Sequence, residues 1–237
     1  MVTEVVAGRN EDRLRQGVLG GTLTFLVMRA DGTQQQQQLV LPPRSGFLGW
    51  SPDGKEIAYV DRGGLGVAGT DGGDARRLVA HGRDGPGPIV SAAWSPDGTQ
   101  IVFERVGGEY GELSVIWITD ADGDGDGTHR LTAADGTARE PAWSPDGRKL
   151  AYACRSKASD ELELCVMNAD GSDQHAITRS GPLEETESPT WSPDGEQIAF
   201  VVSGFADEHQ VFVINADGSQ RRALTSNADN RWPDWQR

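Results

Sequence analysis

The chain has 237 residues, including 31 glycines and 12 prolines, and its formal net charge is −14 at pH 7. A protein this acidic repels nucleic-acid backbones and anionic membranes, so we expect neither as a partner. No apolar run approaches the roughly 20 residues of a membrane helix, and residues 1–8 lack the basic start of a secretory signal, so we expect no membrane insertion.

The first 46 residues hold part of a four-stranded unit. Residues 3–6 and 24–29 have the apolar character of strands, with a turn at 30–32, and we expect a long loop between the two strands. A further strand ends at Leu39-Val40, after a run of five glutamines that we interpret as a solvated sheet edge. The unit lacks its first strand, which must come from elsewhere in the chain.

A pentapeptide, Trp-Ser-Pro-Asp-Gly, then recurs four times. Its tryptophans are Trp50, Trp94, Trp143 and Trp191, and a degenerate copy, Pro233-Asp234-Trp235, ends the chain. Successive tryptophans are 44, 49, 48 and 44 residues apart. A period of about 40–50 residues with strand-like content is typical of a propeller built from four-stranded blades.

The third full unit shows how each blade is built. Its four expected strands span residues 141–143, 149–154, 162–167 and 174–178. Ser144-Pro145-Asp146-Gly147 and Asn168-Ala169-Asp170-Gly171 lie between them and have the residues of tight turns, with glycine where φ is positive.

The sequence therefore predicts an all-β protein with a single β-propeller domain over residues 1–237. We expect five four-stranded blades, closed by a C-terminal strand that joins the N-terminal blade. The blade repeats are expected at about 47–90, 91–138, 139–186 and 187–230, with a composite blade of 1–46 plus 231–237. Such closure removes a free sheet edge and fixes both termini.

Two cysteines, Cys154 and Cys165, fall in neighbouring expected strands of one blade. A disulfide between them would argue for an oxidising compartment, whereas two reduced thiols would simply pack within the blade. Both alternatives are open from the sequence.

One turn is replaced by an aspartate-rich segment containing Asp120, Asp122, Asp124 and Asp126. Alternate carboxylates with glycines resemble the opening of a calcium loop, so these four residues are candidate calcium ligands. The position that would need a bidentate glutamate is Leu131, so this is not a helix-loop-helix site. The alternative is a flexible acidic turn.

The chain resembles the TolB-like, WD40-like propeller repeat family. The resemblance rests on Trp-Ser-Pro-Asp-Gly followed by Ile-Ala-Phe and by Asn-Ala-Asp-Gly-Ser, and it covers about residues 22–236. It implies a protein-binding propeller scaffold, although related propellers also precede catalytic domains in prolyl-oligopeptidase-like enzymes. The chain departs from the family's six-bladed pattern by its five expected blades and has no N-terminal α/β domain.

Function should reside on the face that carries the irregular connections between blades. Arg139, Glu140, Glu187, Arg231 and Trp232 lie near the starts of the innermost strands, so we expect them to form a ligand-binding surface at the channel mouth.

We expect a non-enzymatic, monomeric scaffold that binds a protein or peptide outside the cytoplasm. No nucleophile elbow and no zinc-type histidine motif is present in the sequence. The alternatives are a hydrolase or lyase that uses carboxylates at the channel mouth and a carbohydrate-binding propeller.

Overall fold

The structure is a computed structural model. It describes residues 5–7, 12–19, 22–29, 36–41, 46–71, 73–80, 82, 87–107, 113–123, 127–133, 136–155, 161–179, 181, 184–204, 209–226, 230–231 and 233–235, with the backbone alone for the strands within 5–41 and for Phe47.

The described residues form five antiparallel sheets of four strands each, and each sheet is a meander of consecutive strands. The first sheet contains β1 (Val5–Ala7), β2 (Asp12–Leu19), β3 (Thr22–Arg29) and β4 (Gln36–Leu41). The second contains β5 (Gly46–Trp50), β6 (Glu56–Asp61), β7 (Gly64–Gly69) and β8 (Arg76–Ala80). These units confirm the expected all-β class.

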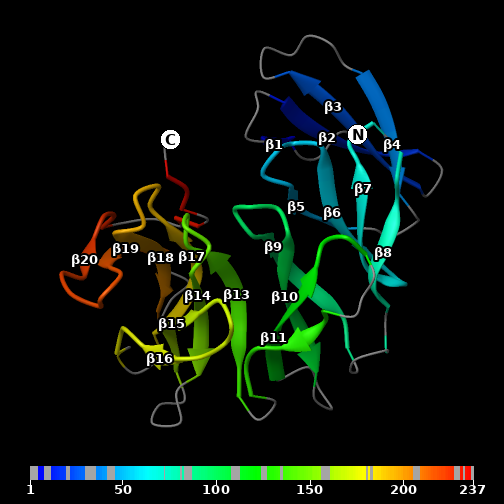
Figure 1. Cartoon of the computed structure of the whole chain (residues 1–237). Coiled ribbons are helices and arrows are strands. Elements are labelled where there is room, and N and C mark those ends of the chain that lie inside the picture. The colour runs from blue at the N-terminus through cyan, green and yellow to red at the C-terminus, as the bar shows by residue number, and fades with distance from the viewer. Residues whose placement is uncertain are drawn as a thin grey trace.

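The remaining three sheets repeat the same order. The third contains β9 (Ile89–Trp94), β10 (Gln100–Gly107), β11 (Leu113–Asp120) and β12 (His129–Arg130). The fourth contains β13 (Ala138–Trp143), β14 (Lys149–Arg155), β15 (Leu162–Asn168) and β16 (His175–Ala176). The fifth contains β17 (Glu185–Trp191), β18 (Gln197–Ser203), β19 (His209–Asn215) and β20 (Arg222–Ala223). The sheets follow one another around an arc (Figure 1).

The hydrophobic core lies between successive sheets. One cluster joins the second and third sheets, one the third and fourth, and one the fourth and fifth. Leu65, Phe103, Ile116, Leu150 and Phe200 are completely buried within these clusters. Because each middle strand is covered on both faces, these strands consist of nearly continuous apolar residues.

The repeated turn is fixed by its own serine and aspartate. In the fourth sheet, the Ser144 hydroxyl donates to Asp146 (2.7 Å), which also accepts from the backbone N–H of Arg148 (3.0 Å). Gly147 has a φ of 70°, and a Cβ added there would lie 3.6 Å from Pro96 of the preceding turn. The positive φ of this turn therefore favours glycine, whereas the space beside Pro96 would admit a Cβ in ordinary van der Waals contact.

The repeated tryptophans connect neighbouring sheets. The indole N–H of Trp143 donates to the carbonyl of Ala93 (3.1 Å), and that of Trp191 donates to Ala142 (3.2 Å). Trp235 donates in the same way to Thr190 (3.1 Å). Trp235 therefore contacts the fifth sheet in the same way as Trp143 and Trp191 contact the sheets that precede theirs.

The expected closure by the C-terminal segment is not what the structure shows. The first sheet takes all four strands from residues 5–41, and β2 occupies the place of the expected long loop. Because β1 pairs with β2, it fills the edge that the C-terminal strand was expected to join. Among the described C-terminal residues, Pro233 to Trp235 form no strand, and Trp235 is bonded to Thr190 of the fifth sheet.

Candidate functional site

The innermost strands are irregular near one end. The pairing of β13 with β14 shifts register between Arg139 and Ala142, and the pairing of β17 with β18 shifts between Glu187 and Thr190. Within these bulges, Glu140 has a φ of 53° and Ser188 a φ of 50°. Such conformations cost about 1–3 kcal/mol for residues other than glycine and are concentrated at functional sites.

Carboxylates stabilise these two bulges. Glu104 accepts hydrogen bonds from the hydroxyl of Ser91 and from the backbone N–H of Glu140, both at 3.1 Å. The carboxylate of Glu140 in turn accepts from the backbone N–H of Ser188, at 2.5 Å. We call Ser91, Glu104, Glu140 and Ser188 the bulge network; it runs through the third, fourth and fifth sheets and lies at the rim of the channel mouth that the sequence predicts.

Sequence reasoning missed Glu104, which is only 4 % exposed. The corresponding positions in the other repeats are Val60, Ala153 and Val201, all apolar. The charged pair Glu104-Arg105 inside the otherwise apolar run of β10 was the signal that could have found it, because a buried carboxylate requires hydrogen-bond donors.

The sequence-predicted ligand residues occupy corresponding repeat positions at this rim. Arg139 and Glu187 each lie four residues before a repeat tryptophan, as does Arg231, which is exposed. Glu187 accepts a hydrogen bond from the Ser203 hydroxyl at 3.3 Å. Arg139 is half-buried, and its side chain has no hydrogen-bond or ion-pair partner within the described part of the chain. Trp232 lies outside the described residues.

A cavity of about 330 Å³ opens on the same face, between the second and third sheets. Asp61, Arg62, Pro88 and Arg105 are among its lining residues. The Arg105 guanidinium is 3 % exposed and lies 5.6 Å from the centre of the Trp117 ring, in a cation–π arrangement. The positive charge of Arg105 thus lies at this cavity, although the residue is buried.

The structure joins Cys154 and Cys165 by a disulfide, with their Cα atoms 5.8 Å apart. Tyr152 pairs with Cys165 and Glu163 with Cys154, so the bridge runs diagonally between β14 and β15. Burial raises the pKa of Tyr152 to about 12.

Of the four candidate calcium ligands, the structure describes two. Asp120 accepts a hydrogen bond from the Gln100 side chain at 3.2 Å, whereas Asp122 is exposed; Asp124 and Asp126 lie outside the described residues. In the part of the chain that is described, no three His, Cys, Asp or Glu side chains are grouped to hold a metal. Calcium binding therefore stays a prediction.

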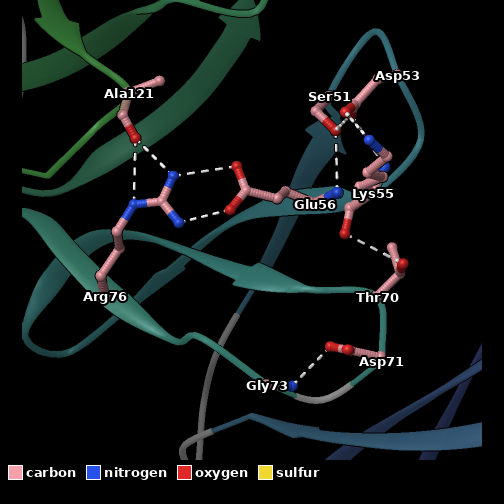
Figure 2. Close-up of polar contacts among 9 residues, drawn as sticks. All are labelled: Ser51, Asp53, Lys55, Glu56, Thr70, Asp71, Gly73, Arg76 and Ala121. Atoms are coloured by element: carbon pink, nitrogen blue, oxygen red, sulfur yellow. Dashed lines mark hydrogen bonds and ion pairs between the residues drawn. The ribbon is translucent and has the colours of Figure 1, made fainter.

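An arginine lies beside the aspartate-rich segment. The Arg76 guanidinium donates to both carboxylate oxygens of Glu56, at 2.5 and 3.0 Å, and to the carbonyl of Ala121 (Figure 2). The hydrogen bonds that Arg76 donates to Glu56 are the main cause that raises the pKa of Arg76, and the charge of Asp122 raises this pKa further. A bound cation at Asp122 would therefore be repelled by Arg76.

Comparison with known proteins identifies the class to which this fold and site belong. The family model of the TolB beta propeller domain matches residues 62–237. The chain therefore belongs to the TolB β-propeller domain family, and its fold is a β-propeller. Within the residues that the structure describes, no helix is long and apolar enough to cross a bilayer.

Individual relatives agree with this assignment. The Tol-Pal system protein TolB of Francisella tularensis is 33% identical over 81 residues, which cover 34% of this chain and 18% of that protein. The chain thus matches about a fifth of the length of this curated relative.

Solved structures share the fold at lower identity. A putative TolB from Agrobacterium tumefaciens has a TM-score of 0.67 at 22% identity and covers 91% of this chain and 76% of its own. An oligogalacturonate lyase in complex with manganese has a TM-score of 0.72 at 16% identity, and the match covers 91% of this chain and 62% of the lyase chain. The same fold thus occurs in a TolB and in an enzyme, so function has to be argued from the site.

Proposed function

We propose that this propeller is a binding module that holds a protein or peptide at its channel mouth. The observation that carries the proposal is the bulge network. Glu104 and Glu140 direct carboxylate oxygens at backbone N–H groups, so these side chains fix the shape of the rim. A rigid rim with irregular loops is the usual basis of recognition in such scaffolds.

The contact groups that we propose are Arg139, Glu187 and Arg231. Arg139 is half-buried, and its guanidinium has no partner among the described residues, which suits it to a carboxylate of the partner because arginine binds carboxylates in a bidentate manner. Arginine is also frequent among the residues that dominate binding energy at interfaces. Glu187 would give the same surface a point of contact for a basic group.

We place this activity outside the cytoplasm. The support is the disulfide between Cys154 and Cys165, since such bonds persist mainly in oxidising compartments. A hydrolase or lyase at this mouth is the alternative, and it would need Glu140 to exchange its bond to Ser188 for one to a substrate.

The proposal is tested by affinity capture from the extracytoplasmic fraction of the source organism, followed by calorimetric titration of the captured partner. The double variant Arg139→Ala, Arg231→Ala is compared with the matched double variant Lys55→Ala, Arg148→Ala, which removes two exposed charges from the repeat turns. We expect the mouth variant to lose the partner and the turn variant to retain it. Equal retention by both variants would overturn the proposed site.

A further inference from the structure

A second hollow lies on the opposite face of the propeller, where the repeat turns gather. It has a volume of about 430 Å³ and is lined by Trp94, Trp143, Trp191 and Trp235 together with several prolines. Three of these indoles are held in place by hydrogen bonds to the preceding sheet. Trp143 and Trp235 are half-buried, so parts of their rings are open to the hollow. The one charged residue among its lining is Asp234.

This face also carries more net negative charge than the channel-mouth face. The turns 51–55, 95–99, 144–148 and 192–196 contain five acidic and two basic residues, and the outer turns 70–75, 121–128, 169–174 and 216–221 contain eight acidic and one basic. The connections on the channel-mouth face, at 62–63, 81–88, 108–112, 131–137, 156–161, 177–184, 204–208 and 224–231, contain ten acidic and five basic residues. The net negative charge is therefore twice as large on the face that carries the repeat turns as on the channel-mouth face.

The tryptophan lining of the hollow and the negative charge of this face favour a ligand that is cationic and partly apolar. The faces of indole rings attract cations, and indole is the strongest side chain in this respect. The long apolar stem of a lysine or arginine side chain can pack against tryptophan and proline while its charged head approaches Asp234. The summed charge of the turns would steer a basic segment toward this face.

We propose that this hollow binds a lysine or arginine side chain from a basic peptide segment of a partner protein. The site is separate from the channel mouth, and it does not depend on the function proposed for that mouth. The propeller would then have two recognition faces, one with Arg139 at its rim and one with tryptophans and Asp234.

The test uses a fluorescein-labelled pentaarginine peptide, with pentaglutamate as the control peptide, and measures anisotropy together with tryptophan emission. Asp234→Asn removes the charge but keeps an oxygen that can accept from the Trp235 N–H, as Asp234 does at 2.8 Å. Asp217→Asn is the matched control, because Asp217 accepts from the Ser219 N–H in an outer turn of the same face. Both variants lose one negative charge.

We expect saturable binding of pentaarginine with a change in tryptophan emission, and no binding of pentaglutamate. Asp234→Asn should weaken binding by about fivefold, as expected for the loss of one partly shielded charge contact, and Asp217→Asn by less than about twofold. Equal weakening by both variants would mean diffuse attraction to an acidic surface and would overturn the proposal, as would absence of binding to the parent. Arg139→Ala should leave the affinity for pentaarginine unchanged, which separates this test from that of the channel mouth.

Discussion

The carboxylate of Glu140 accepts a hydrogen bond from the backbone N–H of Ser188, with 2.5 Å between Oε2 and N. Both residues lie three positions before a repeat tryptophan, and both have positive φ. The side chain of one bulge therefore stabilises the backbone of the corresponding bulge in the next sheet. Neighbouring blades are linked at their innermost strands by this contact as well as by apolar packing.

Replacing Glu140 by alanine should destabilise the fold. The N–H of Ser188 would lose its acceptor in a half-buried position, which costs about 1–3 kcal/mol. Urea unfolding monitored by tryptophan fluorescence measures this difference. Glu185→Ala is the matched control, because the Glu185 carboxylate has no partner within the described residues. Equal stability of the two variants would show that the contact contributes nothing.

The turn glycines should tolerate no side chain. Gly147→Ala would place a Cβ at a φ of 70° and against Pro96, so we expect a loss of about 1–2 kcal/mol from the backbone conformation alone. Gly204→Ala is the control, since a Cβ added at Gly204 meets no atom within 4 Å. Thermal unfolding of the two variants should separate them clearly, and a melting temperature unchanged by Gly147→Ala would refute this account.

The sequence was informative wherever a repeat constrained it. Trp143 and Gly147 recur at fixed spacing because each packs against the preceding blade, so the four-stranded units followed from the period. The strand β2 was missed because Asp12–Leu19 contains several polar residues and no repeat turn precedes it. The role of Glu104 was missed because it depends on a contact with Glu140, 36 residues away. Glu140 lies in a bulge, and no local sequence pattern predicts that bulge.

Acid should destabilise the protein through its turn aspartates. The Ser95 hydroxyl and the Thr99 amide hold the pKa of Asp97 below its ordinary 3.8, and Ser144 and the Arg148 amide do the same for Asp146. Because the folded pKa is the lower one, this stabilisation is complete above the unfolded value and is lost as the pH falls through the folded pKa.

We therefore expect the free energy of unfolding to decline below about pH 4, the ordinary range for aspartate. The double variant Asp97→Asn, Asp146→Asn should be less stable at pH 7 and show a shallower decline in acid. Urea unfolding at a series of pH values measures both effects. A slope identical to that of the parent would show that other groups control the response to acid.

Calcium binding at the aspartate-rich segment predicts a thermal shift. If Asp120, Asp122, Asp124 and Asp126 hold the ion, calcium should raise the melting temperature and a chelator should reverse the rise, because a ligand that binds only the folded state stabilises it. Asp122→Ala should abolish the response, whereas Arg76→Ala should strengthen it by removing a nearby positive charge. A melting temperature that calcium leaves unchanged in all three proteins would remove the metal from consideration.

Reduction of the disulfide should lower the stability of the fourth sheet. The bond closes a loop with a sequence separation of 11, and the chain-entropy relation for such a loop gives about 3 kcal/mol. Cys154 and Cys165 are 9 % and 3 % exposed, so a reductant should act mainly after unfolding. We expect the parent in dithiothreitol to unfold at the same urea concentration as a Cys154→Ala, Cys165→Ala variant, and the oxidised parent at a higher one. If the parent instead yields two alkylatable thiols when unfolded without reductant, the bond is absent and the argument for an oxidising compartment loses its support.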